Sequence, residues 1–468
     1  LVPSIMTYVL SKGAFYWDLD VDFDHSNPNS YHGSEKRLES KAFRLGEEFA
    51  TSDHKLEELG TSLFSNDWLP YRAAFGRGMA RGAHDLRTVW LLLIEQLERQ
   101  PEGHNNFLIF KGFLEETGSI DPALAQELLN QCAKNPLLRK DLVYLYPWGK
   151  FTETDLNRCL ALLDDPDIHP GMYEPILWRD EYGRLPRDRV LDLARRLLSK
   201  PNGDSVVLAA LSMRLHGKEG VVDTLGPEFR RVGLRAAIQS LPRKHNGPGG
   251  SMDHQMECVI NAALRFDGNE AEKQEWLNTI FSVVDKHNGY VHSFPNAIGT
   301  TVALMPVAFL NRVFEGSEEQ QKRRKFFIGY SGYRQSTLAK IDADVLIAWC
   351  KAKNDIGVWA PIASGINLWE EGEEGLTMSE PALRLLEAAP EPEAILEEYA
   401  GRVAPLSWSG SRANVMQPRA DAIKKLIGHD RAEIAEAART VSAKLVDWIE
   451  REKASEKRED MEHEQRFE

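Results

Sequence analysis

Residues 121–136 read Asp-Pro-Ala-Leu-Ala-Gln-Glu-Leu-Leu-Asn-Gln-Cys-Ala-Lys-Asn-Pro. Leu124, Leu128 and Leu129 recur at three- and four-residue spacing, which is typical of the buried face of an amphipathic helix. Asp-Pro at the start and Asn-Pro at the end are the residues that begin and end helices. The stretch therefore predicts a helix of about three turns.

Two later segments, 154–166 and 186–201, repeat this pattern. The Leu-Leu pairs begin at Leu128, Leu162 and Leu197, so successive pairs lie 34 and 35 residues apart. A helix pair with its turns occupies about that length in helical solenoids. Because no alternating β and α pattern accompanies these helices, the sequence predicts an all-α fold. We expect an irregular α-solenoid of HEAT/TPR-like repeats, with an irregular helical domain as the alternative.

Both ends of the chain differ from this central region. Residues 17–25 alternate apolar and acidic side chains at the two-residue period of a strand, which predicts a short β segment near the N-terminus. The sequence thus predicts residues 1–60 as a linker or edge-strand segment plus a charged helix, and residues 61–430 as a helical-repeat domain. Residues 431–468 are predicted to form an amphipathic helix with a charged continuation.

Composition excludes several classes of protein. Of 468 residues, 42% are hydrophobic and 27% are charged, which is typical of soluble globular proteins. No apolar stretch reaches the roughly 18 residues of a membrane helix. A net charge of −14 argues against broad nucleic-acid binding.

Four cysteines without short spacings indicate free thiols, and hence a cytoplasmic location. The chain starts at Leu1 rather than Met, as expected for the C-terminal portion of a longer protein.

Motifs that carry catalysis or hold cofactors are absent from the sequence. Asp18, Asp20, Asp22 and Asp24 lack the glycine and glutamate positions of a calcium loop, so a solvated strand face is favoured over a metal site. The glycine-rich segment 74–82 lacks a phosphate-loop pattern, and a crossing of helices through small residues is favoured over anion contact. We therefore expect no cofactor, no metal and no enzyme activity. An unfamiliar histidine site is the alternative, and its candidate residues are His245, Asp253, His254 and His287.

The basic run at residues 321–327 reads Gln-Lys-Arg-Arg-Lys-Phe-Phe. Cations beside aromatic rings could contact nucleic acid or an acidic protein. Glu318 and Glu319 precede the run, so a helix whose charges complement its dipole explains it without a ligand. The helix is favoured. Nucleic-acid contact at residues 322–325 is the alternative.

The end of the chain resembles a known group of proteins. Residues 400–413 read Ala-Gly-Arg-Val-Ala-Pro-Leu-Ser-Trp-Ser-Gly-Ser-Arg-Ala, followed by Met-Gln-Pro-Arg at 416–419, Leu-Ile-Gly-His at 426–429 and Glu-Gln-Arg-Phe-Glu at 464–468. These motifs resemble the C-terminal end of large bacterial antiphage-defence proteins, STAND-type NTPases related to NLR immune receptors or NAD-consuming SIR2-type proteins. The resemblance implies a helical-repeat region that recognises a phage component and controls an effector located elsewhere. No catalytic residue carries over, because none of these motifs is catalytic.

We therefore expect a cytoplasmic protein-binding module of an antiphage-defence protein, whose partner is a phage protein or an effector domain or subunit. The alternative is a scaffold that assembles its own protomers or the subunits of a complex. Arginine and tryptophan are enriched where proteins contact each other. The candidate contact residues are Trp68, Arg77, Arg81, Lys322, Arg323, Arg324 and Trp408.

Overall fold

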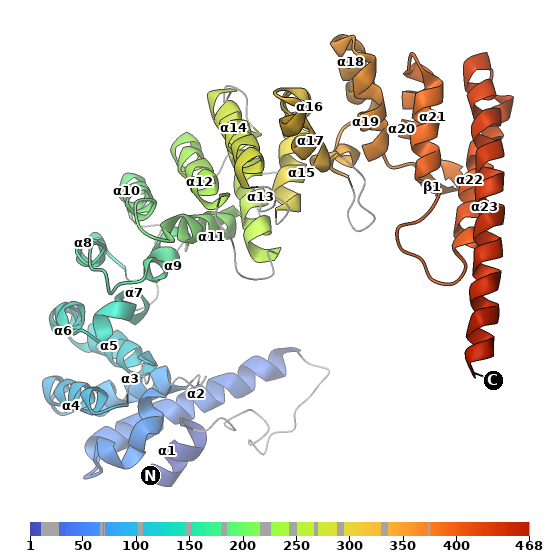
Figure 1. Ribbon diagram of the computed structural model, residues 1–468. Coiled ribbons are helices and arrows are strands. Elements are labelled where there is room, and N and C mark those ends of the chain that lie inside the picture. Colours follow the sequence, from blue (N-terminus) through green and yellow to red (C-terminus); the bar gives the residue numbers. More distant parts are fainter. Residues whose placement is uncertain are drawn as a thin grey trace. The chain divides into compact units, whose positions relative to one another are not determined.

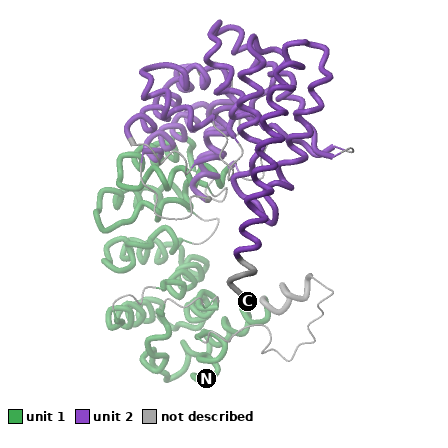
Figure 2. Tube along the Cα trace, turned by 45° about the vertical axis from the view of Figure 1, so that its right-hand side comes forward, with its two compact units in different colours: residues 1–214 green, residues 215–468 purple. Residues whose placement is uncertain are grey.

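A computed structural model describes residues 1–10, 28–65, 69, 71–101, 106–146, 151–178, 185–215, 226–242, 250–265, 270–287, 294–328, 336–372 and 375–467. The chain divides into two compact units, Leu1–Arg214 and Leu215–Glu468 (Figure 2). The division at 1–60, 61–430 and 431–468 stays a prediction.

The first unit consists of helices (Figure 1). Its α-helices are α1 (Val2–Tyr8), α2 (Pro28–Thr51), α3 (Arg72–Gly82), α4 (Leu86–Glu98), α5 (Leu108–Ile120), α6 (Pro122–Lys134), α7 (Leu142–Leu145), α8 (Glu153–Leu160), α9 (Glu174–Trp178), α10 (Arg187–Leu197) and α11 (Gly203–Leu215), which ends at the boundary. Short 3-10 helices are η2 (Leu56–Phe64), η3 (Leu138–Asp141) and η4 (Pro170–Tyr173).

The described residues of the second unit are also helical, apart from a small hairpin. Its α-helices are α12 (Gly226–Ser240), α13 (Gly250–Leu264), α14 (Glu270–His287), α15 (Pro295–Leu304), α16 (Pro306–Phe314), α17 (Glu318–Arg324), α18 (Ala343–Lys353), α19 (Trp359–Gly365), α20 (Glu380–Ala388), α21 (Pro392–Gly401), α22 (Arg412–Lys424) and α23 (Ala432–Phe467). The 3-10 helices are η7 (Lys325–Phe327), η8 (Thr337–Lys340), η9 (Ile356–Val358) and η10 (Lys425–Gly428), and the strands are β1 (Trp369–Gly372) and β2 (Gly375–Met378).

The prediction of an all-α fold with a short β segment is confirmed. In the described residues the β structure is the antiparallel pair β1 and β2, in which Trp369 lies opposite Met378. No strand was predicted there. The strand expected at residues 17–25 lies outside the described residues.

Helix starts follow the polar residues of the sequence. The side chain of Asp121 accepts the backbone N–H of Leu124, so α6 begins at the Asp-Pro step. Thr152 and Asp155 form a capping box at the start of α8, which begins one residue earlier than the predicted segment 154–166. Such caps satisfy N–H groups that have no partner within the helix.

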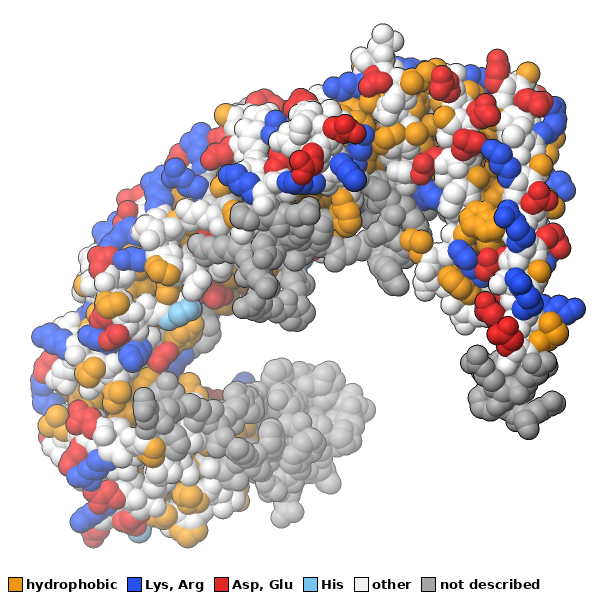
Figure 3. Space-filling model, in the orientation of Figure 1, with side chains coloured by type: hydrophobic (Ala, Val, Ile, Leu, Met, Phe, Trp, Pro, Cys, Tyr) orange, Lys and Arg blue, Asp and Glu red, His pale blue; other side chains and the backbone are white. Residues whose placement is uncertain are grey.

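Side chains link helices that lie about one helix pair apart in the sequence. In the first unit Arg158 of α8 donates to Gln126 of α6 at 2.8 Å, and Arg189 of α10 donates to Glu153 of α8 at 2.7 Å; the partners are 32 and 36 residues apart. In the second unit the indole of Trp349 donates to a residue of α16 that is 38 positions away. Figure 3 shows cationic and anionic side chains interspersed over the surface of the helices. This regularity supports helical repeats within each unit. The solenoid interpretation stays a prediction.

Glycines let α3 lie against α2 and α5 with direct backbone contact. A Cβ atom on Gly78 would lie 1.9 Å from the carbonyl oxygen of Phe43 in α2, and one on Gly76 would lie 2.2 Å from that of Ile109 in α5. Neither distance leaves room for a side chain, and α3 packs on both helices. The predicted crossing of helices through small residues at 74–82 is confirmed.

Among the described residues no single helix is both long and apolar enough to cross a membrane. The pair Pro295–Leu304 and Pro306–Phe314 passes by length and composition when taken together, and it is bent by 110°.

Candidate protein-binding surface

The contact residues predicted in the first unit are held by neighbouring helices or lie outside the described residues. Trp68 is among the latter. Arg77 is half-buried and pairs with carboxylates of both α2 and α5. Arg81, which is exposed, pairs with Glu116 of α5. Both arginines therefore help to join α3 to its neighbours.

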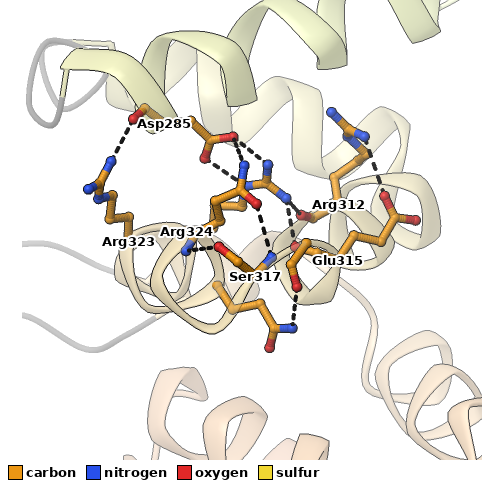
Figure 4. A network of polar contacts seen from close by, with 9 residues as sticks. Asp285, Arg312, Glu315, Ser317, Arg323 and Arg324 are labelled. Atoms are coloured by element: carbon orange, nitrogen blue, oxygen red, sulfur yellow. Dashed lines mark hydrogen bonds and ion pairs between the residues drawn. The ribbon is translucent and has the colours of Figure 1, made fainter.

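The basic run forms α17 and η7, and its Arg324 is the centre of a polar network (Figure 4). The side chain of Arg324 is 5% exposed and donates to both carboxylate oxygens of Asp285 in α14, at 2.9 and 2.5 Å. It also donates to the backbone carbonyls of Arg312 and Glu315, at 2.9 and 2.8 Å. These contacts tie α14, α16 and α17 together, so Arg324 has a structural role.

The charge of Arg324 is compensated by an ionised Asp285. Burial alone would raise the pKa of Asp285, but the hydrogen bonds and charge of Arg324, with a further bond from Gln320, outweigh burial and hold this pKa below its ordinary value. Arg323 donates to the carbonyl of Asp285 at 2.6 Å. Lys322 of the same run is exposed.

The histidine site is not assembled by the described residues. His245 and the side chain of His287 lie outside them. Asp253 is buried, and its carboxylate accepts the backbone N–H groups of Asn296 and Ala297 at 3.1 Å, so it caps the start of α15. A carboxylate engaged in this way has a structural use.

His254 lies on the surface of α13, with Glu257 at 3.5 Å and the sulfur of Cys258 at 3.6 Å. The described part of the chain contains no group of three side chains that could hold a metal ion. Burial raises the thiol pKa of three other cysteines, which disfavours the reactive thiolate. These are Cys132, Cys159 and Cys350.

The last predicted contact residue, Trp408, lies in the connection between α21 and α22. We call residues 402–411 the Trp408 loop. Leu406 and Trp408 are 63% and 49% exposed, so the loop presents two large apolar side chains to solvent. Gly410 has a φ of 75°, a left-handed conformation that suits glycine and turns the chain into α22.

Contacts from α22 and α23 hold the Trp408 loop in place. The guanidinium of Arg412 lies over the indole of Trp408, 4.8 Å from the ring centre, and donates to Glu452 at 3.3 Å. Ser411 caps α22, and its hydroxyl donates to Glu456 at 2.7 Å. The hydroxyl of Ser411 and backbone N–H groups beside it hold the pKa of Glu456 below its ordinary value. The loop is therefore joined to α22 and α23, and the exposed indole lies against Arg412.

A cavity of about 340 Å³ adjoins the Trp408 loop, and we call it the Arg402 pocket. Arg402 donates to the carbonyl of Ala363 at 3.1 Å, and Arg419 donates to the carbonyl of Val403 at 3.1 Å. Both arginines line the cavity. The lining includes Trp369, Glu398, Arg402, Pro405, Leu406 and Arg419.

A second cavity, of about 580 Å³, lies along α14. Pro242 and side chains of α14 such as Asn278 and Lys286 line it, and its described lining residues include no aromatic ring. Ligand sites in proteins combine apolar or aromatic walls with a few fixed polar groups. The Arg402 pocket meets that description better than the cavity along α14.

The sequence singled out Trp408 as a candidate but not the other residues of this surface. Glu398 lies in the last turn of α21 and Arg402 directly follows this helix, while Arg419 and Trp369 come from α22 and β1. No local pattern links the first two residues to Arg419 and Trp369. The hairpin was signalled weakly by Gly372 and Gly375, which flank its turn.

No family model matches this chain, and no curated protein matches it either. Among solved structures, an engineered protein described by a structural genomics consortium aligns with 88% of this chain and 95% of its own chain, at 12% identity and a TM-score of 0.21. A similarity of that size carries no argument about fold or function.

Proposed function

We propose that this chain is a protein-binding module and that the Trp408 loop with the Arg402 pocket is its contact surface. The observation that carries the proposal is the exposure of Leu406 and Trp408 on one loop beside a cavity. Scattered exposed apolar residues are ordinary, but two on one loop beside a cavity form a patch that a partner can cover.

The energetics of binding favour such a surface. Tryptophan and arginine are enriched among the residues that contribute most to protein–protein affinity. Because Arg412 and Ser411 already hold the loop, little ordering entropy is lost when a partner covers Trp408. Leu406 and Trp408 would then leave water, which contributes about 25 cal/mol for each Å² of apolar surface buried.

The partner that we propose is a phage protein, bound in the cytoplasm, whose binding controls an effector located elsewhere. This part of the proposal rests on the sequence resemblance to antiphage-defence proteins. Residues 400–413 are part of that resemblance and contain the whole Trp408 loop. The same segment is thus singled out by the sequence and by the exposed indole.

The test is to use the tagged chain as bait in phage-infected and uninfected bacterial cells and to identify captured proteins by mass spectrometry. The test variant is Leu406→Ser with Trp408→Ala. The matched control is Leu91→Ser in α4, because Leu91 is 62% exposed and lies in the other unit. We expect one phage protein to be captured by the parent chain and the control but lost with the test variant.

Two results would overturn the proposal. Capture of the same phage protein by the test variant would remove the Trp408 loop from the contact surface. Capture of copies of this chain or of host subunits alone would favour the scaffold.

A further inference from the structure

The described lining of the Arg402 pocket contains more cationic than anionic residues. It includes two arginines, Arg402 and Arg419, and one carboxylate residue, Glu398. Burial raises the pKa of Glu398, against the opposing effect of Arg402, so this environment disfavours the charged form of the carboxylate. The charged lining residues therefore give the pocket a net positive charge.

Hydrogen bonds to backbone carbonyls position the two arginine side chains. Arg402 is anchored on Ala363 of α19, and Arg419, from α22, is anchored on Val403. Both side chains are only partly exposed. A guanidinium presents its N–H donors in a planar fork that matches a carboxylate, and such charge-assisted bonds are stronger than neutral ones.

Other lining residues of the Arg402 pocket are apolar. Trp369 of β1 is half-buried, Pro405 is buried and Leu406 is exposed. These groups favour a large apolar side chain of a ligand. A volume of about 340 Å³ lies at the lower end of ordinary ligand pockets, which suits a short segment of a peptide rather than a large cofactor.

We propose that the Arg402 pocket binds a short peptide segment of the partner in which a carboxylate side chain adjoins a large apolar side chain. The carboxylate pairs with Arg402 and Arg419, and the apolar side chain packs on Trp369 and Leu406. This inference rests on the proposed function, because it names the chemistry by which the partner is recognised. Charge complementarity selects the acidic segment over a basic one.

The probe is a fluorescein-labelled peptide that contains Phe-Glu between Gly-Ser flanks, and the readout is fluorescence polarisation with the full chain. Matched peptides replace Glu by Gln or Phe by Ala. We expect the Phe-Glu peptide to bind at least about tenfold more tightly than the Phe-Gln peptide, as a charge-assisted pair requires. The Ala-Glu peptide should also bind more weakly than Phe-Glu.

Protein variants then locate the binding. Arg419→Gln should remove the preference for Glu over Gln, while Arg81→Gln, a cation of the other unit, should keep it. Equal affinity for the Phe-Glu and Phe-Gln peptides, or no binding of any peptide, overturns the inference. Either result leaves the proposed function standing if partner capture still depends on Trp408, so the two failures are distinguishable.

Discussion

Removal of the carboxylate that faces Arg324 should destabilise the second unit strongly. In Asp285→Ala the guanidinium of Arg324, whose side chain is 5% exposed, loses its counter-charge. Breaking a buried pair by removing one partner costs about 3–5 kcal/mol. We expect the lower end, about 3 kcal/mol, because the carbonyls of Arg312 and Glu315 still accept from Arg324 and because the side chain of Asp285 is 18% exposed. For a unit of this size that corresponds to a fall in Tm of roughly 6–12 °C.

The assay is thermal unfolding followed by circular dichroism, with urea unfolding to give the free energy. Lys322→Ala is the matched control, since this exposed cation lies two residues from Arg324, and its free energy of unfolding should change by less than about 0.5 kcal/mol. Replacing both partners, as in Asp285→Leu with Arg324→Met, should recover most of the loss, because no buried charge then remains. Equal stabilities of Asp285→Ala and Lys322→Ala would refute the structural role of Arg324.

The same pair predicts a pH dependence. The pKa of Asp285 is lower in the folded chain than its ordinary value of 3.8, so the stabilisation is complete above that value and is lost as the pH falls through the folded pKa. The difference in unfolding free energy between the parent chain and Asp285→Asn should therefore shrink as the solution is acidified below about pH 4. A difference that stays constant with pH would contradict this assignment.

Three further predictions concern other parts of the chain. Gly78→Ala should lower the free energy of urea unfolding by about 3 kcal/mol or more, because its Cβ would lie 1.9 Å from a carbonyl oxygen. The control Gly118→Ala, whose Cβ would come no closer than 3.7 Å to its neighbour, should be neutral or stabilising by about 0.5 kcal/mol. Similar destabilisation by both variants would contradict the tight crossing. Ser411→Ala should lower the free energy of unfolding by about 1 kcal/mol and weaken partner binding, because it removes the cap of α22 and the bond to Glu456; unchanged binding would show that the loop needs no such support. Iodoacetamide should alkylate Cys258 before Cys132, Cys159 and Cys350, as peptide mapping can show, since burial raises the pKa of the last three thiols; equal rates would contradict their burial.

Helical periodicity made the fold class predictable. Leu128 and Leu197 are buried as their spacing suggested, and Asp121 caps the helix that its Asp-Pro step marked. Gly76 and Gly78 correctly indicated a close crossing of helices, because a glycine has no Cβ atom and lets another backbone approach closely. Local rules of this kind act over a few residues, which is why one sequence suffices to apply them.

The role of the basic run depended on a partner far away in the chain. Arg324 is neutralised by Asp285, which lies 39 residues earlier, and no local pattern pairs the two. The favoured interpretation of the run as a charge-complemented helix agrees with α17, in which Ser317 and Gln320 form the capping box. The sequence did not distinguish Arg324, which is buried, from Lys322, which is exposed.

The Arg402 pocket could not be predicted either, because its residues come from segments that lie far apart in the sequence. Its walls come from α19, α21, α22 and β1, so the pocket exists only after the helices pack. Trp408 was a candidate because of its residue type, but its exposure and its contact with Arg412 required the structure.

The most direct test of the central claim is the affinity of the purified, captured partner for the parent chain, for Trp408→Ala and for Leu91→Ser, measured by biolayer interferometry. If the Trp408 loop is the contact surface, Trp408→Ala should weaken binding by about thirtyfold, the size expected for a dominant interface residue, and Leu91→Ser should leave Kd unchanged. A Trp408→Ala variant that is folded by circular dichroism and binds with the parent Kd would contradict the claim.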